Sequence, residues 1–128
     1  MILLDTCTIL WLTLDQSGLS EGAKKLIQEN ADELAVSAVS AFEIGIKYNK
    51  KNLKLPLAAT LWFFRILEHH HLNQVPITSR IALLSCELPN HHADPSDRLL
   101  IATALTYNCP ILTPDAHIKK YTEIKTVW

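Results

Sequence analysis

The chain has 128 residues, of which 48% are hydrophobic and 20% are charged, and its formal net charge is −1. These values are typical of one soluble globular domain, residues 1–128, that is long enough to bury a core. The near-zero charge excludes an overall basic field, but it does not exclude a nucleic-acid enzyme in which acids at a metal site offset a local basic face.

Cysteine usage and hydropathy indicate a cytoplasmic protein. The three cysteines form no C-x-x-C pair, and we expect them to be small buried residues in a reducing compartment: Cys7, Cys86 and Cys109. Asp5 interrupts the apolar start of the chain, so no signal peptide is expected. Residues 53–67 are the most apolar later stretch, and they are too short to span a bilayer.

Short apolar runs alternate with helical patterns along the chain. Strands are predicted over residues 2–4, 34–36, 72–77, 111–113 and 124–128. Helices are predicted from about residue 19 to 29, 37–50, 57–67, 79–88, 94–107 and from 115 to 121. This alternation predicts an α/β fold, a three-layer α/β/α sandwich around a mostly parallel sheet of four or five strands.

The helix after the second strand begins at Ser37 or at Ser40, and this choice decides how Glu43 is interpreted. If Ser40 is the N-cap, Ser40 and Glu43 form a capping box and Glu43 is structural. Because the strand ends at Val36, we favour Ser37, which leaves Glu43 one turn further in and in need of another role. The buried stripe of this helix is expected to be Val39, Phe42 and Ile46.

Four acids are predicted at one edge of the sheet. Asp5 follows the first strand and Asp115 follows the fourth, where the carboxyl ends of parallel strands form binding sites. Glu43 approaches from the helix after the second strand. Asp97 lies in the first turn of the 94–107 helix, for which Asp94 is the expected N-cap and Pro95 the first residue. A capping role is an alternative for both Asp94 and Asp97.

Convergence of these acids would require a cation. Carboxylates a few ångströms apart raise each other's pKa and cannot all ionise without positive charge nearby. Oxygen ligands select hard cations, so Mg²⁺ or Mn²⁺ is expected, and such a metal activates water for phosphoryl chemistry.

Four stretches together resemble the PIN domain (PilT N-terminus), and within it the VapC-like toxins of bacterial toxin–antitoxin pairs. They are Leu4–Trp11, Val36–Lys47, Leu88–Ala102 and Ile111–Asp115, in this order along the chain. The resemblance extends to Tyr121 and Trp128. Two departures are Cys7, where His is frequent, and Ser96, where an aromatic residue is common.

The resemblance implies a metal-dependent endoribonuclease that uses one or two Mg²⁺ or Mn²⁺ ions and metal-bound water, without a protein nucleophile. It matches the family's catalytic and metal-binding acids to Asp5, Glu43, Asp97 and Asp115. Asp94 matches an additional acid of this subgroup. Supporting roles are implied for Thr6, Thr113 and His92. In this interpretation Asp5 and Asp97 are the principal ligands, whereas Asp115 is a ligand or supports one and Glu43 is a ligand or a base that orients water.

The implied partners are an RNA substrate, a cognate antitoxin and a second copy of the chain. For RNA the candidates are Lys47, Lys50 and Lys51, although a solvated helix end is the simpler interpretation. For an antitoxin or dimer surface they are Trp11, Trp62, Phe63 and Phe64, with core packing as the alternative. The His69–His71 run is expected to be a polar helix end, because consecutive side chains diverge.

Other classes fit less well. A response-regulator receiver domain needs paired acids after the first strand, and a haloacid-dehalogenase-like phosphatase needs a second acid two residues after Asp5, where Cys7 stands. A non-catalytic PIN-like binding module is the remaining alternative, which the full acidic set disfavours.

Overall fold

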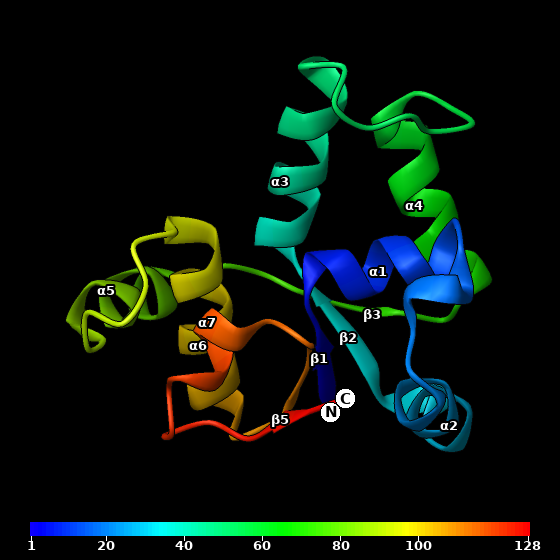
Figure 1. Ribbon diagram of the computed structural model, residues 1–128. Coiled ribbons are helices and arrows are strands. Elements are labelled where there is room, and N and C mark those ends of the chain that lie inside the picture. The colour runs from blue at the N-terminus through cyan, green and yellow to red at the C-terminus, as the bar shows by residue number, and fades with distance from the viewer.

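A five-stranded sheet forms the middle layer of the computed structural model, which describes residues 1–128 (Figure 1). The strands are β1 (Ile2–Leu4), β2 (Leu34–Ser37), β3 (Asn73–Val75), β4 (Ile111–Leu112) and β5 (Thr126–Val127). They lie in the order β3-β2-β1-β4-β5, and every neighbouring pair is parallel. The predicted α/β sandwich is therefore confirmed, with five strands.

Helices connect the strands and cover both faces of the sheet. They are α1 (Thr6–Thr13), α2 (Glu21–Glu29), α3 (Ala38–Asn49), α4 (Ala59–His69), α5 (Ser79–Glu87), α6 (Pro95–Tyr107) and α7 (Ala116–Lys119). Two short 3-10 turns cover Gln16–Gly18 and Ala31–Glu33. No helix is both long and apolar enough to cross a membrane.

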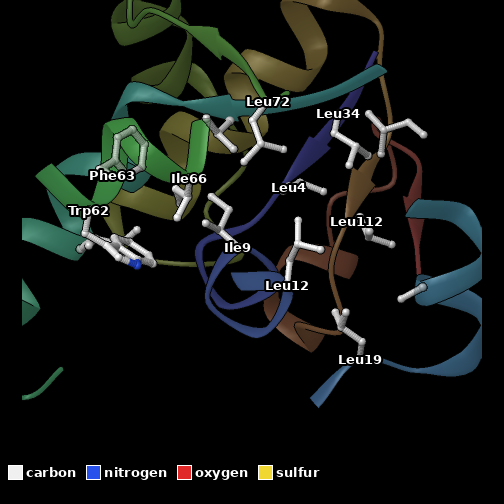
Figure 2. Packing of buried hydrophobic residues seen from close by; sticks show 14 residues of the cluster. Leu4, Ile9, Leu12, Leu19, Leu34, Trp62, Phe63, Ile66, Leu72 and Leu112 are labelled. Carbon is white, nitrogen blue, oxygen red and sulfur yellow. The ribbon is translucent and has the colours of Figure 1, made fainter. Parts of the chain in front are cut away.

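The core consists of two apolar clusters, one on each face of the sheet. Leu4 of β1 packs with residues of α1, α2 and α4, as Figure 2 shows. Leu3, which points to the opposite face, packs with residues of α6 and α7. This division follows from the alternation of side chains along a strand, and it explains why β1 and β4 consist of apolar residues throughout.

The prediction for the buried side of α3 is wrong in part. Val39 is buried as expected, but the exposed fraction is 65% for Phe42 and 37% for Ile46, whereas Ile44 is buried. The reason is that α3 does not lie flat on the sheet: it extends away from the sheet's carboxyl edge (Figure 1). Only the side of α3 that meets its neighbours is covered.

Three other expectations need correction. Helix α4 begins at Ala59 instead of residue 57, and its buried side is formed by Trp62, Phe63 and Ile66. The strands predicted over 72–77 and 124–128 are shorter, because β3 and β5 lie at the two edges and each pairs with one neighbour only. All three cysteines are free thiols, but only Cys109 is buried.

Candidate active site

Asp5 is the most deeply buried of the four acids, with 5% of the residue exposed. It follows β1 and caps α1, because its Oδ1 accepts a hydrogen bond from the Thr8 backbone N–H at 2.7 Å. The hydroxyl of Thr113 donates to Oδ2. Burial raises the pKa of Asp5, these hydrogen bonds oppose the rise, and the charge of Asp115 adds to it.

Thr113 connects Asp5 to Asp115. Its hydroxyl oxygen, which donates to Asp5, accepts a hydrogen bond from the Asp115 backbone N–H at 3.0 Å. Asp115 in turn caps α7 by accepting from the His117 backbone N–H at 2.7 Å. The ends of β1 and β4 are thus joined in one network that contains two carboxylates.

Glu43 reaches the same region from α3. Ser37 caps this helix by accepting from the Val39 N–H at 3.1 Å, which confirms the choice of Ser37 as N-cap. Glu43 is therefore free of a capping box, and its Oε1 accepts a hydrogen bond from the Thr6 hydroxyl at 2.9 Å. One turn further along α3, Lys47 Nζ lies 3.9 Å from Glu43 Oε2.

Asp94 and Asp97 have different roles at the start of α6. Asp94 caps the helix through the Ser96 N–H at 2.9 Å, as expected from the sequence. Asp97 does not cap the helix: its Oδ2 lies 2.7 Å from Nε2 of His92. The ligand atoms of His92, Asp94 and Asp97 all lie within 4.8 Å of one another.

The four acids share one electrostatic environment. Burial raises the pKa of Asp97 to about 6; the hydrogen bond with His92 opposes the rise, and the charges of Asp94, Asp115 and Glu43 add to it. Asp115 also raises the pKa of Asp5. Each acid therefore lies close enough to influence the pKa of another.

Two residues that support this cluster were not identified from the sequence. The ring of His117 stacks on that of His92, with centroids 4.7 Å apart and planes 9° from parallel. Arg98 donates hydrogen bonds to the carbonyl oxygens of Leu88 and His92. Its position one residue after Asp97 was the only available signal, and the hydrogen-bond acceptors lie in a loop with no periodic pattern.

Two of the aromatic residues expected on a partner surface are in the core. Trp62 and Phe63 are buried against the first cluster, so they are not available to a partner. Phe64 has an exposed fraction of 57%. Trp11 is half-buried and packs against Trp128, with ring centroids 5.6 Å apart.

The donor set is chemically suited to a hard divalent cation. The ligand atoms that lie within 4.8 Å of one another are those of His92, Asp94 and Asp97. The charges of Glu43 and Asp115 act on Asp97 from two other elements. Burial, together with the charges of neighbouring carboxylates, disfavours the ionised forms of Asp5 and Asp97 and raises their pKa values. A cation with oxygen preference, such as Mg²⁺ or Mn²⁺, would provide that charge.

Comparison with known proteins gives a consistent result. The PIN domain family model matches residues 2–124. Ribonuclease VapC22 of Mycobacterium tuberculosis (strain ATCC 25618 / H37Rv) is 32% identical over 130 residues, which cover 99% of this chain and 98% of that protein.

Solved structures share the fold at low sequence identity. The crystal structure of VapBC2 from Rickettsia felis bound to a DNA fragment from their promoter contains a chain with a similar fold. The TM-score is 0.74 and the sequence identity is 15%, and the match covers 99% of this chain and 98% of that chain. FitAcB from Neisseria gonorrhoeae gives a TM-score of 0.67 and 16% identity, with coverage of 100% and 97%.

Proposed function

The chain belongs to the PIN domain family, and from this premise we propose that it is a metal-dependent endoribonuclease, the toxin of a toxin–antitoxin pair. The Mycobacterium tuberculosis relative carries the name ribonuclease and matches over nearly the whole of both chains. The observation that carries the proposal is that Thr113 joins Asp5 to Asp115, while the charges of Asp115 and Glu43 both act on Asp97.

The metal would be held by Asp5 and Asp97, with Asp115 and Glu43 as further ligands or as groups that orient the attacking water. Asp94 is an additional candidate on the rim. When bound, Mg²⁺ or Mn²⁺ would lower the pKa of the attacking water and would provide positive charge that offsets the negative charge of the phosphodiester.

The chain's own residues prepare this chemistry by fixing the carboxylates. Thr113 holds Asp5, Thr6 holds Glu43, and His92 holds Asp97, each through one hydrogen bond. Because these hydrogen bonds already fix the orientation of the carboxylates, the acids need little rearrangement when a cation and a phosphate bind. Glu43 is positioned to accept a proton from water, while Lys47 beside it can attract the RNA backbone.

The proposed partners are RNA, an antitoxin and a second copy of the chain, acting in the cytoplasm. Lys50 and Lys51 are exposed at the end of α3 and would extend the positive charge of Lys47 along the RNA. Phe64, at the rim of a small groove of about 170 Å³ between α3 and α4, is the aromatic residue best placed for an apolar partner segment. Several structures with this fold are toxin–antitoxin complexes.

Replacement of Asp97 by Asn tests the function. Asp97→Asn keeps the size of the side chain and leaves the Asp94 cap in place, so the fold should persist while Mg²⁺- or Mn²⁺-dependent cleavage of RNA falls by about two orders of magnitude or more. Asp32→Asn, which changes an exposed acid in a 3-10 turn, is the matched control and should retain activity. Full activity of Asp97→Asn would refute the assignment, and a wild-type chain that binds RNA but never cleaves it would favour the non-catalytic module.

A further inference from the structure

A surface cleft of about 610 Å³ lies at the C-terminal end of α3, and the proposed chemistry does not use it. It is lined by Tyr48, Asn49, Lys51, Leu53, Lys54 and Leu55. We propose that this α3 cleft is a nucleotide subsite, which binds one unpaired base and its phosphate a few nucleotides from the bond that is cleaved. The inference rests on the proposed ribonuclease function and adds where the substrate strand is held.

The lining of the α3 cleft combines the groups that bind single-stranded RNA. Tyr48 contributes an aromatic face and Leu53 an apolar one, and bases pack on such surfaces irrespective of sequence. The amide of Asn49 can donate and accept hydrogen bonds at a base edge. Lys51 and Lys54 provide charge for the phosphate, and the volume lies within the range of about 300–1,000 Å³ found for small-ligand sites.

The α3 cleft begins at the end of the helix that carries Glu43. Glu43 and Lys47 are four residues apart in α3, a spacing that places them on the same face, and Lys51 follows shortly after the helix ends at Asn49. Lys47 already contacts Glu43 at 3.9 Å. The part of α3 from Glu43 to Asn49 spans about 9 Å, which a single strand covers with a few nucleotides at roughly 3.4 Å or more each. Charge therefore continues from the site to the cleft.

The backbone of Lys51 makes the subsite testable by a substitution that should not harm the fold. Helix α3 ends in a Schellman motif, in which the Asn52 N–H donates to the Lys47 carbonyl at 2.9 Å and the Lys51 N–H donates to that of Tyr48 at 3.1 Å. Lys51 has φ 61°, the left-handed conformation for which glycine is strongly preferred. Glycine at position 51 would therefore relieve the backbone and remove the positive charge in one substitution.

The decisive variant is Lys51→Gly, because it should improve the fold and weaken binding. Affinity of the full chain for a fluorescent single-stranded RNA of about twelve nucleotides is measured by anisotropy in EDTA, so that no metal or cleavage is involved. We expect thermal stability to be unchanged or raised, affinity to fall severalfold, and the slope of log affinity against log salt to fall by about 0.7.

His71→Gly is the matched control. His71 ends α4 in the same motif, with φ 52°, the Leu72 N–H donating to Leu67 and its own N–H donating to Glu68. This replacement relieves the same backbone strain away from the α3 cleft, so RNA affinity should not change. Equal affinity of Lys51→Gly and wild type would overturn the subsite.

Tyr48→Leu tests whether a base is bound as well as a phosphate. Loss of stacking should lower affinity by roughly five- to one-hundredfold at an unchanged salt slope. No loss, or competition by polyglutamate as strong as by RNA of equal charge, would reduce the α3 cleft to a general anion surface and overturn the proposal. The metal-dependent cleavage assay is separate: its failure with intact RNA binding refutes the ribonuclease function, not the subsite.

Discussion

Arg98 Nη1 donates a hydrogen bond to the hydroxyl oxygen of Tyr121 at 3.1 Å, which ties α6 to the segment after α7. The same guanidinium donates to the carbonyl oxygens of Leu88, Pro89 and His92 at 2.9–3.2 Å. These carbonyls belong to the loop that carries His92 toward Asp97. Arg98 therefore determines the geometry of an acid that it does not contact itself.

Replacing Arg98 by Met should destabilise the protein and impair the site together. The aliphatic part of the side chain is kept, but three carbonyls and a hydroxyl lose their donor, which should lower the free energy of unfolding by about 1–3 kcal/mol. Urea denaturation measures the stability, and Mg²⁺-dependent RNA cleavage measures the site. Arg80→Met, at an exposed position on α5, is the control and should be near neutral in both. Full stability in Arg98→Met would show that water replaces the guanidinium.

Gly18 and Gly45 should respond in opposite directions to replacement by Ala. A Cβ at Gly18 would collide with the indole ring of Trp11, which is itself packed on Trp128. Overpacking of this kind costs about 1–3 kcal/mol. At Gly45, inside α3, a Cβ meets nothing within 4 Å, so the higher helix propensity of Ala should stabilise by about 0.5–1 kcal/mol. Thermal denaturation measures the stability of both variants. A Gly18→Ala variant more stable than the wild type would contradict the packing of Trp11 against Gly18.

The positions of Asp5 and Asp115 could be predicted because they depend only on strand ends. In a parallel sheet the carboxyl ends lie at one edge, so an acid directly after a strand is brought to that edge. The capping roles of Ser37 and Asp94 were equally predictable, since they rest on residue type and local spacing.

Other features depend on tertiary contacts that no local pattern encodes. The contact of Asp97 with His92 requires the loop after α5 to return to the sheet edge. Three hydrogen bonds from Arg98 to carbonyl oxygens of that loop fix its path, and a fourth ties Arg98 to Tyr121. The exposure of Phe42 follows from the angle at which α3 leaves the sheet. Helix α4 is apolar nearly all round, so its pattern could not show that Phe63 is buried while Phe64 is exposed.

The pKa of Asp97 predicts how metal binding depends on pH. Because this pKa is raised to about 6, protons compete with the cation below that value, and Mg²⁺ affinity should fall by about tenfold per pH unit below pH ~6. Above it, affinity should level off. Titration calorimetry in buffers of different ionisation enthalpy measures both the affinity and the protons released. A midpoint near the ordinary value of 3.8 would contradict the environment described for Asp97.

The same shift predicts how stability changes without metal. A carboxyl whose folded pKa lies above its unfolded value stabilises the fold fully while both states are protonated, and this contribution is lost as pH rises from about 4 to about 6. Ionisation of Asp97 should therefore lower the free energy of unfolding of the metal-free protein between about pH 4 and pH 6. The Asp97→Asn variant should not show this decrease. Chemical denaturation at several pH values in EDTA provides the measurement. Parallel curves for the two proteins would show that Asp97 is not the group responsible.

Thr113 should be essential to the fold as well as to the site, because its hydroxyl joins two of the acids. It donates to Asp5 and accepts from the Asp115 N–H. Thr113→Val keeps the shape but leaves Oδ2 of the buried Asp5 carboxylate without its donor, while the Thr8 N–H still binds Oδ1. The free energy of unfolding should therefore fall by about 1–3 kcal/mol, and the pKa of Asp5 should rise further.

Thr113→Ser is the matched control for this variant, since it keeps the hydroxyl and removes only a methyl group. It should retain metal-dependent cleavage, whereas Thr113→Val should lose most of it at neutral pH and recover part at higher pH, when Asp5 ionises. The pH profiles of cleavage for the two variants separate loss of the hydrogen bond from loss of packing. If Thr113→Ser were as inactive as Thr113→Val, the methyl group and not the hydroxyl would hold Asp5 in place.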